Sequence, residues 1–499
     1  MSSLRPRSLG ALLLAAAISM ASACSRLEPS SERTAAASTS IPDALALELP
    51  DEITGSVLRL ALVRPGSWDP IAVSLADQGA VIVSDLLYDG LTETTADGRL
   101  VPALATEWTT SDDGLAWTFS LDAERTNAAA VRSSFERLRA NAPASAAAGL
   151  LSSVARIDAV DDATVRFVLS SPNAGFAWVV SGLPFSIVDD GGAPTGRYRL
   201  VADDAEHALL TNGDGEDALS VAIAWVSDDA TAEADAASGA VDGAVVPVDS
   251  SERAVREVGL APSARSIVRF FVLDPASTAL ADLRVRQALL TAVDRSTLLD
   301  QLSSPAFALD GIVAPTVAGF QGDPCGAPCA FDPDRARALV AEVGVVPTIR
   351  VGFTTPHEAE LAANIVEQLG VVGVTAEAVE LATGQLATAI DGTPVDMFPY
   401  GWVAPAGSVD AIVPPLLSST STANPLGSIS PDVDQLLATA MVTTADTERW
   451  ALLAAAHQQA LASAVLLPVA AAENRFVVSP AFRGVVTRAD GSIEIRSLP

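Results

Sequence analysis

Short runs of hydrophobic residues separated by turn sequences predict the elements of the first part of the chain. Residues 57–63 (VLRLALV) are typical of a strand that ends at a Pro-Gly pair, and residues 105–121 contain two short runs around the turn sequence SDDG. Between later strands, Val131, Phe135 and Leu138 recur at helical spacing. Residues 197–226 predict an antiparallel pair of strands over Asn-Gly and Asp-Gly turns.

The pattern changes near Ser266. The run SIVRFFVLD predicts a buried strand, and longer helical segments then alternate with short strands, which indicates an α/β lobe. One of these helices has clear ends, with Asp332 as the N-cap, Pro333 in the first turn and Gly344 after the last turn. A chain of 499 residues also exceeds the size at which one core usually divides, so more than one lobe is expected.

The first residues have the features of an export signal. Two arginines precede an uncharged Ala/Leu-rich run that is too short to span a membrane and that ends at Cys24. The sequence ASAC at 21–24 resembles a bacterial lipobox, although Ala21 replaces the usual Leu. We therefore predict a lipoprotein signal peptide at 1–23 with lipidation of Cys24, and a flexible Ser/Thr/Ala/Pro-rich tether at 24–55. The alternative is an ordinary signal cleaved nearby.

Charge and composition exclude one class of partner. The chain has 30 basic and 61 acidic residues, every basic one an arginine, and its formal net charge is -31. We expect no binding to nucleic acid, because that requires a basic surface. The acidity otherwise indicates solubility and does not identify a fold.

The other two cysteines, Cys325 and Cys329, lie in GDPCGAPCAFDP. In an exported protein this spacing predicts a disulfide on a Pro/Gly-rich loop. Two thiols with no neighbouring histidine make a poor metal site. The bond is therefore expected to constrain a local loop and not to join lobes.

The sequence offers little support for an enzyme. A P-loop requires lysine, and PHEAEL begins like a zinc-protease helix but has Leu361 where the second histidine should stand. His207, His357 and His457 are widely spaced and share no motif. We expect no catalytic residues, no metal and no cofactor.

Eight segments occur in a recognisable order and, with the extended chain that follows them, span residues 57–479: LRLALVRPGSWDP, LLYDGLTETTADGRLVPALATEWTTSDDGLAWTFSL, PTGRYRL, ASGAVDGAVV, DLRVRQALLTAVDR, FDPDRARALVAEVG, VDMFPYGW and SPDVDQLLATA. They resemble the extracytoplasmic solute-binding proteins of family 5, the oligopeptide-, dipeptide- and nickel-binding class that serves ABC importers. The resemblance implies an α/β, bilobed periplasmic-binding-protein type II fold with two α/β lobes, a two-strand hinge and a ligand cleft between the lobes. Lobe I is then expected at 56–266, lobe II at 267–464, and the return to lobe I at 465–499.

Two departures from the family pattern stand out. The segment DAERTNAAAV omits residues that usually precede the first helix, which implies a trimmed subdomain in lobe I. Peptide binders of the family tend to place an acid three residues after the Trp of VDMFPYGW, to hold the α-amine, and some place an Arg three residues before it. Here these positions are Pro405 and Pro399. The ligand is therefore expected to be neutral or blocked at its amino end, or to use another acid, with Asp410 the nearest candidate.

The resemblance also implies where the cleft lies. Ser67 and Trp68 follow the first strand, and Tyr400 and Trp402 end a strand of the second lobe that faces the same gap. Aromatic side chains suit a cleft that must release its ligand, because they combine apolar area with a single donor. Asn424 occupies a position where the family has a polar residue. The alternative for each aromatic is packing inside a lobe, which we favour for Trp108 and Trp117 of the hairpin.

These observations predict a substrate-binding component of an ABC importer, anchored to the extracytoplasmic face of the membrane through an N-terminal lipid. The expected ligand is a peptide or peptide-like small solute, the expected partners are an ABC permease and ATPase complex, and the protein is expected to be a monomer. The alternative is a cell-surface sensor or interaction lipoprotein that keeps the fold without serving transport.

Overall fold

The computed structural model describes ten segments of the chain: 56–141, 145–189, 191–213, 217–247, 264–299, 306–322, 325–326, 329–381, 395–482 and 484–496. The predicted signal peptide, Cys24 and the predicted tether lie outside these segments. Within them, no helix is long and apolar enough to cross a bilayer.

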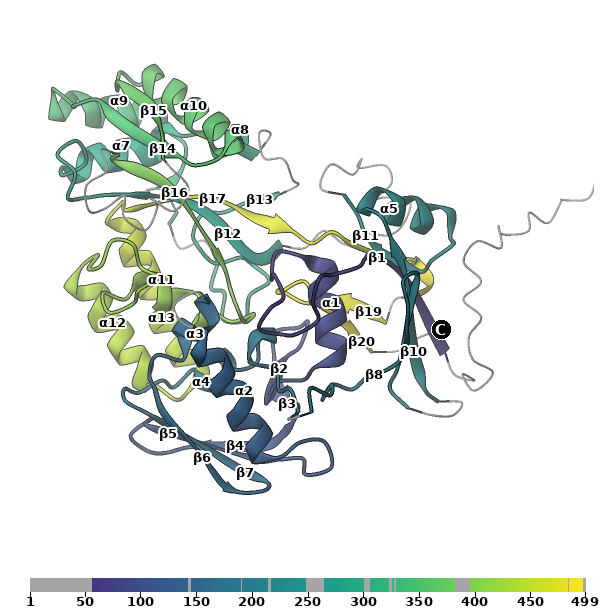
Figure 1. Cartoon of the computed structure of the whole chain (residues 1–499). Helices are drawn as coiled ribbons and strands as arrows, with labels where there is room; N and C mark the ends of the chain where they lie inside the picture. Colours follow the sequence, from purple (N-terminus) through teal and green to yellow (C-terminus); the bar gives the residue numbers. More distant parts are fainter. Residues whose placement is uncertain are drawn as a thin grey trace, which may run out of the picture. The chain divides into compact units, whose positions relative to one another are not determined.

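The first sheet has six strands in the order β18-β11-β1-β10-β9-β8 (Figure 1). Its strands are β1 (Ser56–Val63), β8 (Arg199–Asp203), β9 (His207–Thr211), β10 (Leu219–Val226), β11 (Gly243–Val245) and β18 (Phe476–Val478). β1 lies parallel to β10 and β11, and β10 lies antiparallel to β9, as the sequence predicts. Two helices accompany this sheet: α1 (Gln78–Leu87), whose N-cap is Asp77, and α5 (Asp229–Ser238), whose N-cap is Asp228.

A four-stranded antiparallel sheet, in the order β4-β5-β7-β6, carries its own core. Its strands are β4 (Ala105–Thr110), β5 (Ala116–Leu121), β6 (Val154–Asp161) and β7 (Thr164–Leu169), and its helices are α2 (Ala128–Ala140) and α3 (Ala146–Leu150). The predicted hairpin is β4 and β5. Val131, Phe135 and Leu138 form the buried face of α2, so the helical spacing in the sequence is confirmed.

A short hairpin and two short helices connect this sheet to the rest of the chain. The hairpin is β2 (Thr92–Thr94) with β3 (Leu100–Pro102), and the helices are α4 (Phe176–Val179) and the 3-10 helix η2 (Leu183–Phe185). A second hairpin, β19 (Val485–Thr487) with β20 (Ile493–Ile495), follows the 3-10 helix η7 (Pro480–Phe482) near the C-terminus. The backbone N–H of Ala96 donates to the Glu494 carboxylate, so the two hairpins are in contact.

The second sheet also has six strands, in the order β13-β17-β12-β16-β14-β15. Its strands are β12 (Ala264–Leu273), β13 (Ala306–Ala308), β14 (Ile349–Phe353), β15 (Ala376–Glu380), β16 (Met397–Val403) and β17 (Leu466–Glu473). The accompanying helices are α7 (Leu283–Ala292), α8 (Arg295–Leu299), α9 (Pro333–Val343) and α10 (Pro356–Val371). The predicted ends of α9 are confirmed, since the Asp332 side chain accepts from the backbone of Arg335 and Gly344 has a positive φ of 84°.

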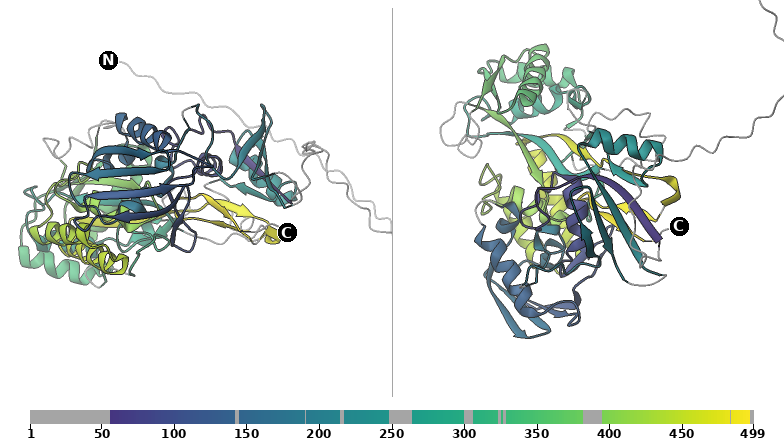
Figure 2. Two further views of the ribbon diagram at one scale, coloured as in Figure 1. Left: turned by 90° about the horizontal axis from the view of Figure 1, so that it is seen from below. Right: turned by 45° about the vertical axis from the view of Figure 1, so that its right-hand side comes forward.

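A further group of helices completes the part of the chain around the second sheet. It consists of the 3-10 helix η6 (Val409–Ala411), α11 (Val413–Leu417), α12 (Pro431–Val442) and α13 (Asp446–Ala462). Both views of Figure 2 show the yellow-green helices α12 and α13 next to the blue segments that include α4. The rings of Trp178 on α4 and Trp450 on α13 are 5.0 Å apart, which confirms the contact.

The two larger sheets divide the described chain into two lobes. We call residues 56–247 and 474–496, with the first and the four-stranded sheets, lobe I, and residues 264–473, with the second sheet, lobe II. The sequence analysis placed the return to lobe I at 465. Strand β17 nevertheless pairs with β12 through Glu473, so the chain returns to lobe I at Asn474, nine residues later than that and just before β18.

Buried polar side chains fix this second crossover. The Gln78 amide donates to Asn474 and to the carbonyl of Gly491, and its oxygen accepts from the backbone of Arg475. At the start of β12, the Arg265 guanidinium donates to the carbonyls of Leu75 and Asp490 at 2.7 and 2.8 Å. Arg265 donates to carbonyls of lobe I, and the backbone of Arg475 donates to Gln78 of lobe I. The two segments that cross between the sheets are therefore both hydrogen-bonded to lobe I.

Candidate ligand-binding cleft

The loop that follows β16 is one of the parts of lobe II that touch lobe I. Its backbone pairs with the neighbouring loop of lobe II, since Ala318 donates to the carbonyl of Gly407 and Val409 donates to the carbonyl of Ala318. The Ser408 hydroxyl accepts from the backbone of Asp410 and starts η6. These hydrogen bonds all lie within lobe II, so they hold the loop at residues 404–411 without any contact to a ligand.

Two glycines of lobe I allow this loop to approach closely. A Cβ atom on Gly182 would overlap the carbonyl of Pro405, and a Cβ atom on Gly175 would overlap the carboxylate of Asp410. A backbone hydrogen bond of 2.9 Å from Ala174 to the carbonyl of Met441 joins the lobes at the same place. The lobes therefore meet here through backbone atoms, at a distance that only glycine permits.

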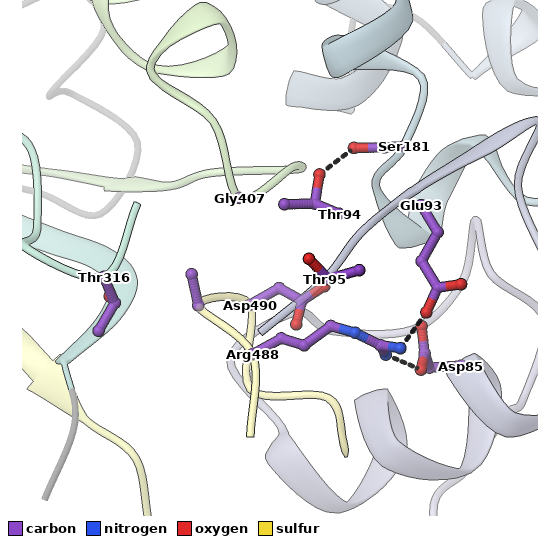
Figure 3. A pocket seen from close by; sticks show the side chains of 10 residues that line it. Asp85, Glu93, Thr94, Thr95, Ser181, Thr316, Gly407, Arg488 and Asp490 are labelled. Atoms are coloured by element: carbon purple, nitrogen blue, oxygen red, sulfur yellow. Dashed lines mark hydrogen bonds and ion pairs between the residues drawn. The ribbon is translucent and has the colours of Figure 1, made fainter. Parts of the chain in front are cut away.

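Beside this contact lies a small polar pocket with residues of both lobes, which we call the seam pocket (Figure 3). It is lined by Asp85, Glu93, Thr94, Thr95, Ser181, Arg488, Ala489 and Asp490 of lobe I and by Thr316 and Gly407 of lobe II. Its volume is about 20 Å³, which is the space for one water molecule. The Thr94 and Ser181 hydroxyls form a hydrogen bond of 2.7 Å at its edge.

Arg488 organises the charged side of the seam pocket. Its guanidinium lies 2.7 Å from the Asp85 carboxylate, forms an ion pair with Glu93 and donates to the carbonyl of Ile493 at 3.1 Å. Figure 3 shows Asp85 and Glu93 converging on this guanidinium. With Asp490, the pocket holds three carboxylates and one guanidinium.

Burial changes the acidity of these groups. Removal from water raises the pKa of Asp85 to about 7, although the nearby Arg488 opposes the shift. For Arg488, burial alone would lower the pKa, but the carboxylates of Asp85, Glu93, Asp490 and Glu494 together outweigh it and raise the pKa. The arginine thus stays charged, while Asp85 titrates near neutral pH.

Comparison with known proteins identifies the family. The family model for bacterial extracellular solute-binding proteins, family 5 Middle, matches residues 99–424. The chain belongs to this family. Membership places the chain among binding proteins and not among enzymes, and it agrees with the resemblance drawn from the sequence.

Individual members of the family resemble the chain over most of its length. The glutathione-binding protein GsiB of Escherichia coli O1:K1 is 26% identical over 419 residues, which cover 75% of this chain and 81% of GsiB. The unliganded open form of the periplasmic murein tripeptide-binding protein MppA matches with a TM-score of 0.75 at 20% identity, over 88% of this chain and 97% of MppA. HbpA2 from Haemophilus parasuis matches with a TM-score of 0.76 at 21% identity, over 89% of this chain and all of HbpA2. These structures share the bilobed fold of the family.

Two of the aromatic residues that were predicted to line the cleft, Trp68 and Trp402, lie in different surroundings. Trp68 lies at the end of β1, 6.3 Å from the ring of Trp225, and the guanidinium of Arg64 lies 5.8 Å from its ring. Trp402 is 6% exposed within the lobe II core, and its indole N–H donates to the carbonyl of Ala411. Trp402 therefore braces the loop after β16 in this structure.

The remaining predicted residues also make internal contacts. Ser67 accepts from the backbone of Asp69, Tyr400 is half-buried and donates to the carbonyl of Ala423, and the buried Asn424 donates to the carbonyls of Ser418 and Gly427. None of these five residues lines the seam pocket. Their role as ligand contacts remains a prediction.

Asp410 has a role that the sequence did not suggest. Its carboxylate is buried and accepts from the fully buried guanidinium of Arg449 at 2.8 Å, from the indole of Trp450 at 3.0 Å and from the Ser408 hydroxyl at 3.0 Å. A carboxylate with these partners is part of a structural ion pair and is not available to a ligand amine. We therefore replace the suggestion that Asp410 binds the amine.

Sequence reasoning missed the charged group of the seam pocket. Asp85, Glu93 and Arg488 are separated by up to about 400 residues, and none belongs to a local motif. The only feature of the sequence that indicated their proximity was the order of the family segments, because this order implies that the C-terminal segment returns to lobe I.

Proposed function

We propose that this protein is the solute-binding subunit of an ABC importer and that it captures a peptide or peptide-like solute between its two lobes. The observation that carries the proposal is the seam pocket, where polar side chains of lobe I face the loops of lobe II. The names of the relatives support a peptide ligand: GsiB is a glutathione-binding protein, and a DppA of the same fold from Helicobacter pylori was solved with the peptide STSA.

Ligand entry requires the lobes to separate. A pocket of about 20 Å³ has no room for a peptide, whereas ligand sites usually occupy 300–1,000 Å³. The two segments that cross between the lobes, before β12 and after β17, are the natural place for a hinge. We infer that the lobes move apart at this hinge to admit the ligand and that the seam pocket widens as the ligand binds.

The charges of lobe I favour a ligand with an ammonium group. Pro405 stands where peptide binders of the family tend to have an acid, and Asp410 is occupied by Arg449. The lining of the seam pocket has three carboxylates, those of Asp85, Glu93 and Asp490, for one guanidinium. We propose that carboxylates of lobe I hold the α-amine, which makes an unblocked peptide acceptable.

The predicted aromatic and polar residues then act around this pocket. Ser67, Trp68 and Tyr400 are partly exposed and are proposed to extend the cleft wall. Trp402 and Asn424 are proposed to hold the lobe II loops in shape behind it.

Calorimetry with short peptides tests the proposal. Glutathione, a tripeptide and a tetrapeptide are titrated into the purified protein, and at least one is expected to bind with micromolar affinity, about -8 kcal/mol. The variant Thr94→Arg places a long side chain in the seam pocket and is expected to abolish binding. The matched control Thr106→Arg changes an exposed residue of β4 and should bind normally. Normal binding by Thr94→Arg would remove the seam pocket from the ligand site.

Anchoring and assembly complete the proposal. We propose that Cys24 carries a lipid on the extracytoplasmic face of the membrane, that the protein is a monomer and that it delivers ligand to a permease and ATPase complex. Cys325 and Cys329, whose Cα atoms are 5.6 Å apart, are proposed to form a disulfide in the mature protein. Labelling with palmitate should mark the wild type and not Cys24→Ser, and an unlabelled wild type would contradict the anchor.

A further inference from the structure

A second and much larger cavity lies on the other side of the β2–β3 hairpin. Its volume is about 630 Å³, within the range of ligand sites. It is lined by Gly98, Arg99, Leu100, Trp108, Trp117, Ala174, Ala177, Trp178, Thr444, Asp446, Thr447 and Trp450. Lobe I supplies the hairpin, the four-stranded sheet and α4, and lobe II supplies the start of α13. We call this space the tryptophan cavity.

Aromatic rings dominate its wall. The chain has seven tryptophans, and four of them line this one cavity. The rings of Trp178 and Trp450 meet at 68° with centroids 5.0 Å apart, so their faces are roughly perpendicular. The indole N–H of Trp117 donates to the carbonyl of Asn173, and that of Trp450 donates to Asp410. The indole N–H groups of these two rings are therefore already bonded, and the rings contribute apolar and aromatic surface to the lining.

The charges around the cavity leave an excess of negative charge. The buried guanidinium of Arg449 is shared between Asp410 at 2.8 Å and Asp446 at 2.6 Å, which makes two carboxylates for one cation. Asp446 lines the cavity, and 45% of its side chain is exposed. The cation of the lining, Arg99, is already paired with Asp97 at 2.8 Å. An anion would find no unpaired cation among the lining side chains.

We propose that the tryptophan cavity is a binding site for a small organic cation, such as a quaternary ammonium or guanidinium group. Indole faces attract cations through the ring quadrupole, and this attraction is stronger where water is partly excluded. A carboxylate at the rim adds selectivity for positive charge. The site is separate from the seam pocket and does not depend on the peptide-binding function.

A pair of isosteric probes tests the charge requirement. Choline and its uncharged analogue 3,3-dimethylbutan-1-ol have nearly the same shape, and each is titrated into the purified protein by calorimetry while tryptophan fluorescence is recorded. Choline is expected to bind saturably and at least ten times more tightly than the neutral alcohol. Equal affinities, or no saturable change with choline, would overturn the proposal.

A matched pair of variants locates the site. Thr447 is an exposed lining residue of α13, so Thr447→Arg adds bulk and positive charge at the cavity and is expected to weaken choline binding at least tenfold. Gln458→Arg adds the same charge to an exposed position of the same helix that does not line the cavity, and it should bind choline like the wild type. Equal binding by both variants would place the choline site elsewhere. Because Thr447→Arg leaves the seam pocket intact, peptide affinity should be unchanged, which separates this test from that of the proposed function.

Discussion

Lobe I meets lobe II in two chemically opposite ways on the two sides of the β2–β3 hairpin. On the side of Thr94 and Thr95, Gly182 lets the backbone of lobe I approach the backbone of Pro405, and the seam pocket that remains is small, polar and charged. On the side of Gly98 and Arg99, indole rings fill the contact and leave a cavity of about 630 Å³. The comparison indicates that the lobes pack closely where the contact residues are small, and that they leave a cavity between them where the contact residues are large.

The ion pair between Asp410 and Arg449 links the two sides, because Asp410 touches Gly175 and also accepts from Trp450. We expect Asp410→Ala to have the largest effect on stability. Arg449 is fully buried and would lose its buried carboxylate partner, while the half-exposed Asp446 would compensate only part of its charge, so the free energy of unfolding should fall by about 3 kcal/mol. Urea denaturation measures the change.

An exposed pair supplies the control for this prediction. Asp158 and Arg156 are 2.8 Å apart on the exposed strand β6, and Asp158→Ala should leave the unfolding free energy within experimental error. A similar small loss for Asp410→Ala would show that the buried pair does not stabilise the fold.

The glycine contact is expected to control ligand affinity more than stability. Gly182→Ala places a Cβ atom on the carbonyl of Pro405 and should therefore prevent full closure of the seam pocket. Because closure contributes to binding, peptide affinity is expected to fall at least tenfold, about 1.4 kcal/mol, and the radius of gyration with ligand should stay larger than that of the wild type. Calorimetry and small-angle scattering measure the two effects.

Gly213→Ala is the matched control, since a Cβ atom there meets no atom within 4 Å. Its peptide affinity and its compaction should equal those of the wild type. If Gly182→Ala behaves in the same way, the approach of Pro405 to lobe I is not part of closure.

The sequence was a good guide to elements whose cause is local. The N-cap and C-terminal glycine of α9 follow from three residues, and the buried stripe of α2 follows from helical spacing. The family order of segments predicted two lobes and two crossovers. The sheet pairing puts β12 from Ala264 and β17 through Glu473 in the same sheet, so both crossovers lie a few residues from the bounds that the sequence suggested.

The candidate site was less accessible to sequence reasoning because its contacts are not local. Asp410 looked like a free acid near an aromatic strand, yet its partner Arg449 lies 39 residues later on another helix. Trp402 looked like a cleft wall, but its indole finds a carbonyl nine residues away and becomes buried. The residue type alone does not tell whether such a side chain binds a ligand or stabilises a loop, because aspartate and tryptophan can do both.

The last prediction concerns the pH dependence of stability at the seam pocket. Burial raises the pKa of Asp85 to about 7 from 3.8, so the folded protein holds this proton more tightly than the unfolded chain does. The stability contributed by protonation is fully present below pH 3.8 and is lost as the pH rises through about 7. The positive charge of Arg488 lowers the pKa of Asp85 and so reduces this loss of stability. The negative charges of Glu93, Asp89 and Asp490 raise the pKa and increase the loss.

Asp85→Asn removes this titration and leaves Glu93 and Asp490 beside Arg488. The melting temperature of the wild type, minus that of the variant, is therefore expected to decrease steadily from pH 4 to pH 7.5 and to level off above it. Asp158→Asn, on exposed β6, should give a constant difference over the same range. Parallel curves for the wild type and Asp85→Asn would mean that Asp85 is ionised throughout, and the seam pocket would then carry its full negative charge at every pH at which a peptide is bound.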